Sequence, residues 1–158
     1  MTRVAVAALL AAAVCAAQAQ TTATATAPAL RAGTAKLVNG QVTASNGGVE
    51  RVLAPGDPVS AADRVSTGAA SSASLVLRDG TLIVLGPASR MDLREFSFDA
   101  TTYEGNLAVN MLRGTMRMVS GLIRKNRPDA VRIETPTALI GVRGTDFIVD
   151  VEPAEEGK

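Results

Sequence analysis

Six carboxylates in two stretches are the residues of this sequence best able to do chemistry. The first stretch holds Asp57 and Asp63, and the second holds Asp92, Glu95, Asp99 and Glu104. Two carboxylates are enough for glycoside hydrolysis. Sugar clefts usually also offer aromatic platforms, however, and the chain has three Phe, one Tyr and no Trp. We therefore expect these carboxylates to be turn and surface residues.

Other catalytic chemistry lacks its usual side chains. The chain has no His and a single cysteine, Cys15. The commonest general base, a thiol nucleophile and the soft-metal ligands are therefore missing from the rest of the sequence. No phosphate-binding loop, G-x-S-x-G or metalloprotease motif occurs. We predict a protein that is not an enzyme, with no catalytic residue, metal site or cofactor.

Two polar segments are candidates for binding. The basic cluster Arg124-Lys125-Asn126-Arg127 could meet an anionic partner or form a solvated loop between strands. The segment from Asp99 to Glu104 carries the lone Tyr103 and is either an interaction edge or simply a longer connection. The candidate partner contacts are Tyr103, Arg124, Lys125 and Arg127.

The first residues predict export. A cationic start at Arg3 precedes an apolar run and the sequence Ala17-Gln18-Ala19, the layout of a cleavable signal peptide over residues 1–19. A retained membrane anchor and lipidation of Cys15 are the alternatives. Cleavage leaves a chain of about zero net charge, which argues against binding nucleic acid through its phosphates. It also leaves no transmembrane helix and no cysteine for a disulfide.

Turn residues divide the remaining chain into short apolar runs. Residues 20–32 are a low-complexity leader, residues 33–151 hold the folded domain, and residues 152–158 form an acidic tail expected to be disordered. Short Val, Leu, Ile and Thr runs with no sustained helical period predict an all-β domain. Strands expected near the end of the chain place Val131, Ile133, Phe147, Val149 and Val151 inward.

Two hairpins are predicted from alternation. A two-residue turn at Asp79-Gly80 pairs Leu77 with Leu82 and Leu75 with Val84, on one apolar face. A turn at Arg113-Gly114 pairs Met111 with Met116 and Val109 with Met118. In both, the apolar side chains fall on the same face.

The order of the turn motifs resembles the FecR domain family over about residues 37–151. No single motif is specific, but their order and spacing are. The residues that carry the resemblance include Gly56, Asp57, Thr67, Gly68, Asp79, Gly80, Thr135, Pro136, Gly141, Arg143, Gly144 and Thr145. We expect these to be structural.

The resemblance implies an exported all-β binding and signalling domain. In the iron-uptake regulator that founded the family, such a domain sits in the periplasm and passes a signal from an outer-membrane transporter to a sigma factor. That regulator has a cytoplasmic segment and a transmembrane helix where this sequence has a signal peptide, so sigma regulation is not carried over. The sequence resembles stand-alone FecR-domain proteins of Gram-negative bacteria.

These observations predict one compact domain of about ten short strands, arranged as a solenoid-like β-roll or a two-layer β-sandwich. The leading function is a non-enzymatic periplasmic module that binds an envelope protein. The alternatives are a self-associating structural or matrix protein, and a glycan- or peptidoglycan-binding domain. Secretion beyond the periplasm, the oligomeric state and the partner's identity stay open.

The stretch from Thr135 to Val149 is expected to be architecture. Pro136 should end a strand because it lacks an amide donor. Gly141 and Gly144 should allow tight turns or close packing. Arg143 either holds loop carbonyls or binds a ligand.

Overall fold

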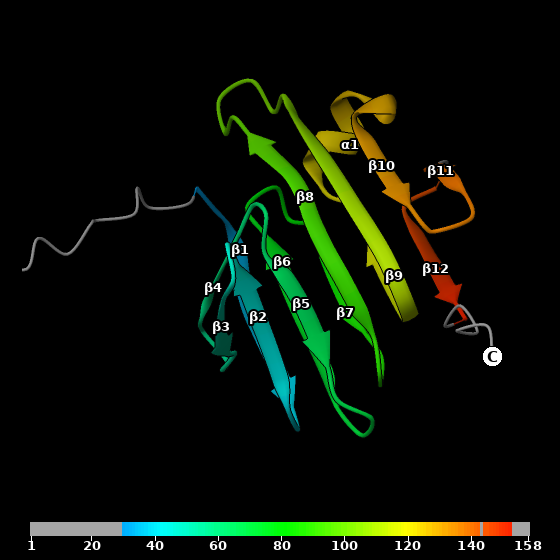
Figure 1. Ribbon diagram of the computed structural model, residues 1–158. Coiled ribbons are helices and arrows are strands. Elements are labelled where there is room, and N and C mark those ends of the chain that lie inside the picture. The colour runs from blue at the N-terminus through cyan, green and yellow to red at the C-terminus, as the bar shows by residue number, and fades with distance from the viewer. Residues whose placement is uncertain (1–29, 143, 153–158) are drawn as a thin grey trace, which may run out of the picture.

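The structure, a computed structural model, describes residues 30–142 and 144–152. The expected all-β domain is confirmed, with twelve strands in this part of the chain (Figure 1). The strands are β1 (Arg31–Asn39), β2 (Val42–Asn46), β3 (Val49–Val52), β4 (Pro58–Ser60), β5 (Arg64–Thr67), β6 (Ser72–Leu77), β7 (Leu82–Leu85), β8 (Arg90–Phe98), β9 (Gly105–Val119), β10 (Val131–Glu134), β11 (Leu139–Gly141) and β12 (Asp146–Val151). The helix α1 (Leu122–Asn126) and the 3-10 turn η1 (Pro128–Ala130) join β9 to β10.

The expected signal peptide, residues 20–29 of the expected leader, Arg143 and the end of the acidic tail lie outside the described residues. The start of the domain differs slightly from expectation, because β1 begins at Arg31 and Ala32 is fully buried. No helix in the described ranges is both long and apolar enough to cross a membrane.

The twelve strands form one continuous sheet that curls over on itself. One half, sheet A, has the order β4-β1-β6-β7-β9-β12. The other half, sheet B, has the order β3-β2-β5-β8-β9-β10-β11. All neighbours are antiparallel except β10 and β9. The long strand β9 belongs to both halves, so it carries the sheet from one layer to the other.

One core lies between the two halves. Along most of the strands alternate side chains are buried, as a half-buried sheet requires. Both halves contribute to a single cluster, for example Val65, Met91 and Val109 from sheet B, and Leu75 and Met116 from sheet A. The chain passes repeatedly between the halves, which gives the roll-like coiling seen in Figure 1.

The core positions expected near the chain's end are found there. Val131, Ile133 and Val149 are buried, and Phe147 and Val151 pack partly buried against the same cluster. The pattern of alternation was therefore sufficient to orient β10 and β12.

The predicted hairpin at Arg113-Gly114 is wrong. These residues lie inside β9, whose first part pairs with β8 and whose second part pairs with β7 and β12. Gly114 has φ of +85° and lies against Ser89, so the strand bends here as it changes sheet. The four residues expected inward, Val109, Met111, Met116 and Met118, are nevertheless all fully buried.

The hairpin at Asp79-Gly80 exists, but its predicted register is wrong by one residue. The loop has three residues, since the Leu77 amide donates to the Thr81 carbonyl at 2.9 Å. Leu75 therefore faces Ile83, and Val76 faces Leu82. The one-residue shift exchanges the faces, so Ile83 and Leu85 are buried where Leu82 and Val84 were expected.

Candidate functional site

The basic cluster lies on a short helix that is fixed to the core. Ile123 of α1 is fully buried. The Leu122 amide donates to the Asp79 carbonyl at 2.9 Å, and the Gly121 amide donates to the Thr81 hydroxyl at 3.0 Å. The solvated loop considered for this segment is thus a helix and a 3-10 turn, whose basic side chains project from an anchored backbone.

The β8–β9 loop is held in shape by its first residue. Asp99 Oδ1 accepts hydrogen bonds from the amides of Thr101 at 2.7 Å and Thr102 at 3.1 Å. Tyr103 has φ of +58° and its ring centroid lies 6.5 Å from that of Phe98. The loop is therefore an ordered turn, and it presents a tyrosine that is 49% exposed.

The two candidate segments lie side by side. Asn126 Nδ2 donates to the Thr102 carbonyl at 3.3 Å and so joins α1 to the loop. Tyr103, Leu122, Lys125 and Asn126 line a shallow hollow of about 180 Å³. Tyr103 and Lys125, which the sequence offered separately, are thus part of one surface at the end of the roll that carries α1 (Figure 1).

A larger hollow adjoins the other side of α1. It measures about 600 Å³, and β11 contributes all of its residues to the wall. The lining consists of Arg124, Pro128, Asp129, Val131, Arg132, Leu139, Ile140, Gly141 and Val142. Arg132 was not among the sequence candidates, because it stands alone in an alternating strand and only the fold brings it beside Arg124. Arg127 lies in a smaller hollow that Arg132 also lines.

Among the described residues, the cations of this surface form no ion pair. We define the basic end face as Tyr103, Leu122, Arg124, Lys125, Arg127 and Arg132. The ion pairs found within residues 30–142 and 144–152 are Arg51–Asp63, Arg64–Asp92 and Arg117–Asp146, all elsewhere. On the basic end face, Arg124 Nε makes only a long bond of 3.4 Å to the Val142 carbonyl. The face is therefore electropositive and free to meet an anion.

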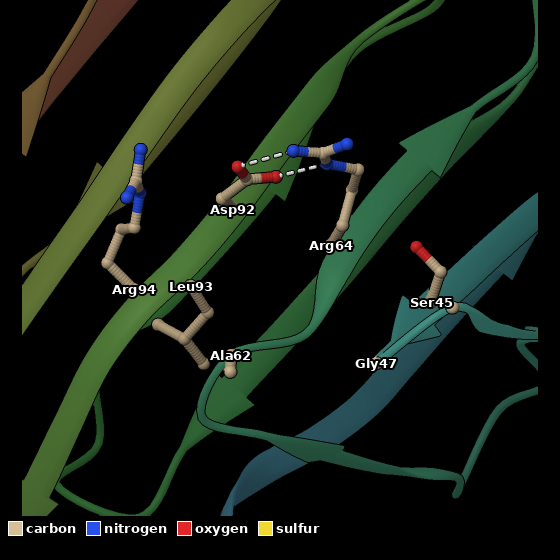
Figure 2. A pocket seen from close by; sticks show the side chains of 8 residues that line it. Ser45, Gly47, Ala62, Arg64, Asp92, Leu93 and Arg94 are labelled. Atoms are coloured by element: carbon tan, nitrogen blue, oxygen red, sulfur yellow. Dashed lines mark hydrogen bonds and ion pairs between the residues drawn. The ribbon is translucent and has the colours of Figure 1, made fainter.

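Four of the six carboxylates considered for catalysis are engaged in structural contacts, Asp99 in the turn described above and three others elsewhere. Asp63 is buried and bound to Arg51 Nη2 at 2.7 Å, and Asp57 accepts from the Ala54 amide at 2.8 Å. In the hollow of Figure 2, Asp92 forms a two-bond pair with Arg64 at 2.6 and 2.9 Å. This pair raises the pKa of Arg64 above its ordinary value.

No group of three acidic, His or Cys residues able to hold a metal occurs in the described part of the chain. The carboxylates above face guanidinium and amide donors rather than one another.

Most family-motif residues stabilise turns. The Thr67 hydroxyl donates to the Gly86 carbonyl at 2.7 Å, and Asp79 Oδ2 accepts from the Thr81 hydroxyl at 2.7 Å. The Thr135 amide donates to the Ala138 carbonyl at 2.8 Å, which closes the turn that contains Pro136. The remaining motif residues in the described ranges also sit in or beside turns: Gly56, Asp57, Gly68, Gly80, Gly144 and Thr145.

Gly141 does not serve close packing, contrary to one of the expectations for it. It lies in β11, and no heavy atom of the described residues, its two chain neighbours aside, would come within 4 Å of an added Cβ. Gly144 likewise has open space around it, but its φ of +136° requires a turn conformation. The Thr145 carbonyl accepts from the Ser120 amide at 2.7 Å and so ties this turn to the end of β9.

Fold and surface together define a small all-β domain with an electropositive, partly apolar face at one end. The chain belongs to the FecR protein family, whose family model matches residues 63–157. The match begins just before β5, while the earlier strands β1 and β2 pair directly with β6 and β5 of the matched part.

One solved structure, described as a cell surface anchoring domain, is similar in sequence to part of the chain. It is 36% identical over 38% of this chain and 80% of that chain, with a TM-score of 0.37. No curated protein matches the chain.

The Asp99 turn should weaken in acid. Bonds from the Thr101 and Thr102 amides lower the pKa of Asp99 below its ordinary value. Because the pKa of Asp99 is lower in the folded state, its ionised carboxylate stabilises the turn at any pH above the unfolded-state pKa of about 3.9. This contribution is lost as the pH falls through the folded-state pKa. Carboxyl ¹³C NMR should show Asp99 titrating below pH 3.9, with the Thr101 and Thr102 amide resonances moving in the same titration. Titration at or above that value would contradict the turn geometry, and Asp99→Asn should remove the transition.

Proposed function

We propose that this FecR-family domain is a non-enzymatic binding module of the cell envelope that engages a protein partner through the basic end face. The observation that carries the proposal is a set of cations that form no ion pair with any residue the structure describes, beside two exposed apolar side chains. Leu122 is 37% exposed and Tyr103 is 49% exposed. Exposed aromatic and arginine side chains on an anchored backbone are the usual centre of a protein interface.

The compartment we infer is the periplasm of a Gram-negative cell. The support for this compartment is the signal-peptide layout of residues 1–19. Membership of the FecR family, whose members act in signalling and regulation, separately favours a protein partner over a substrate. Mass spectrometry of the exported protein should find Gln20 as its first residue. A mature protein that retains residues 1–19 would contradict signal cleavage.

Site-specific crosslinking in cells tests the proposed face. A photoreactive phenylalanine at Tyr103 should yield one discrete adduct of higher mass. The same group at Ile148, which is 67% exposed on β12, serves as the control position. The double variant Lys125→Glu/Arg127→Glu should lower the Tyr103 adduct about tenfold, because reversed charges at an interface repel the partner. Equal adducts from both positions, or no effect of the charge reversal, would contradict the proposal.

A further inference from the structure

We propose that β11, which lies beside the basic end face, is a docking strand, and that the partner's segment is an extended, acidic peptide that adds to β11 as a further strand. This inference rests on the proposed function, because it assumes that the face binds a protein. It specifies the chemistry of the bound segment and the residues that hold it.

Four strands lie at the edges of the described sheet, and three of them are blunted. Proline and charged side chains at an edge discourage the addition of another strand. The strand β4 begins with Pro58, β3 carries Glu50 and Arg51, and β12 carries Asp146 and Asp150. The strand β11 has the sequence Leu-Ile-Gly and carries neither proline nor charge. It is therefore the edge best suited to pair with another chain.

Within the described residues, the outer backbone groups of β11 have no strand partner. Ile140 pairs with Ile133, and Leu139 pairs with Glu134. The bond from the Thr135 amide to the Ala138 carbonyl begins the ladder. Hydrogen-bonded and non-bonded pairs alternate in an antiparallel ladder, so Ile140 bonds inward to β10 while the amides of Leu139 and Gly141 face outward. Strand addition requires outward amides of this kind.

The hollow beside β11 selects the side chains of the added strand. Its lining has two cationic residues, Arg124 and Arg132, and one anionic residue, Asp129. Between Leu122 and Glu134 the chain has four cationic and two anionic side chains. The apolar part of the lining includes Leu139, which is 69% exposed, together with Ile140 and Val142. This combination fits a strand that alternates carboxylate and aliphatic side chains, because guanidinium groups bind carboxylates with two parallel bonds.

The test uses two nine-residue fluorescent peptides and the full mature protein. In the first peptide every second residue is valine, and the residues between the valines are glutamate and threonine. The second peptide has lysine in place of each glutamate. By fluorescence anisotropy the protein should bind the glutamate peptide at least about tenfold more tightly than the lysine peptide. Arg132→Glu should reverse this preference, since the reversed charge now meets lysine. Lys36→Glu on β1, in the opposite half of the sheet, should leave it unchanged.

A backbone variant separates strand addition from simple charge attraction. Leu139→Pro removes an outward amide but not the bond between Ile140 and Ile133, so it should abolish binding while a thermal melt shows an intact fold. If this variant melts early, a glutamate peptide that is N-methylated at alternate residues takes its place. It keeps the charges but loses backbone donors, so strand addition predicts that it does not bind, whereas charge attraction alone predicts that it does. Binding of neither peptide, or equal binding of both, would overturn the inference. If either of these results came with a charge-sensitive crosslink at Tyr103, the proposed function would still stand. If the protein selected the glutamate peptide but gave no such crosslink, only the proposed function would be contradicted.

Discussion

Gly114→Val is expected to lower the free energy of unfolding by about 4 kcal/mol, near the upper end of the range for single substitutions. Valine would have to adopt a φ of +85°, a conformation that costs a non-glycine residue about 1–2 kcal/mol. Its Cβ would also come within 2.6 Å of Ser89 Cα. Ser89 cannot easily move, because it is buried and its hydroxyl accepts from the Thr115 amide at 3.1 Å. The bend that carries β9 between the two halves of the sheet would therefore be strained.

Urea denaturation of a glycine series measures this effect. Gly144→Val meets no neighbouring atom but is strained by its φ of +136°, so it should cost about 2 kcal/mol. Gly141→Val has neither restriction, lies in a strand and should change stability by less than about 0.5 kcal/mol. Equal losses at all three positions would show that close packing at Ser89 is not what sets the cost.

Asp63→Ala is expected to lower the free energy of unfolding by about 3 kcal/mol, because it removes a buried carboxylate that satisfies several donors. Only 1% of the Asp63 side chain is exposed. It accepts from Asn46 Nδ2 at 2.8 Å, Arg51 Nη2 at 2.7 Å and the Ser60 amide at 2.9 Å. These donors come from β2, β3 and β4, so the substitution releases contacts between three strands.

The matched control is Asp92→Ala. Asp92 is also paired with an arginine, Arg64, but the two side chains are 15% and 47% exposed. Because this pair is partly solvated, the loss in free energy of unfolding should be about 1 kcal/mol. Chemical denaturation of both variants at pH 7 compares them. A loss at Asp63 no greater than that at Asp92 would mean that burial does not strengthen the Asp63 contacts. Asp63→Asn should recover part of the loss, since its side-chain oxygen can still accept one of these bonds.

The turn at Asp79-Gly80 shows where a local pattern stops being decisive. Leu75, Leu77, Leu82, Ile83, Val84 and Leu85 are all aliphatic, so apolar character does not distinguish one face of this hairpin from the other. The register depends on the loop length. Asp79 stabilises the three-residue loop by accepting from the Thr81 hydroxyl at 2.7 Å, and the Thr81 hydroxyl in turn accepts from the Gly121 amide. Gly121 is forty residues away along the chain, so the register depends on a tertiary contact.

The bend at Gly114 shows a second limit. A two-residue hairpin turn and a bend within one strand both shift the buried positions from odd to even numbers. Val109, Met111, Met116 and Met118 are buried under either arrangement, which is why these core residues were correctly predicted from a wrong topology. Only the partners of β9, namely β8 and β10 before the bend and β7 and β12 after it, decide between the two.

The candidate site was predictable as separate pieces. Tyr103, Arg124, Lys125 and Arg127 stood out by residue type, but their proximity depends on the bond between Asn126 and the Thr102 carbonyl. Arg132 and the open edge of β11 were not predictable, because an arginine in an alternating strand looks like any solvent-facing residue. Its role arises only when η1 and β11 place a hollow beside it.

By itself the sequence determined the β class, the family, most of the core and the turn residues, because these depend on alternation, steric preference and the order of short motifs along the chain. The tertiary structure decided the register of β6 and β7, the continuity of β9 and the grouping of the basic end face. These features depend on which strands become neighbours, and strand pairing joins residues far apart in the chain, which local patterns do not encode.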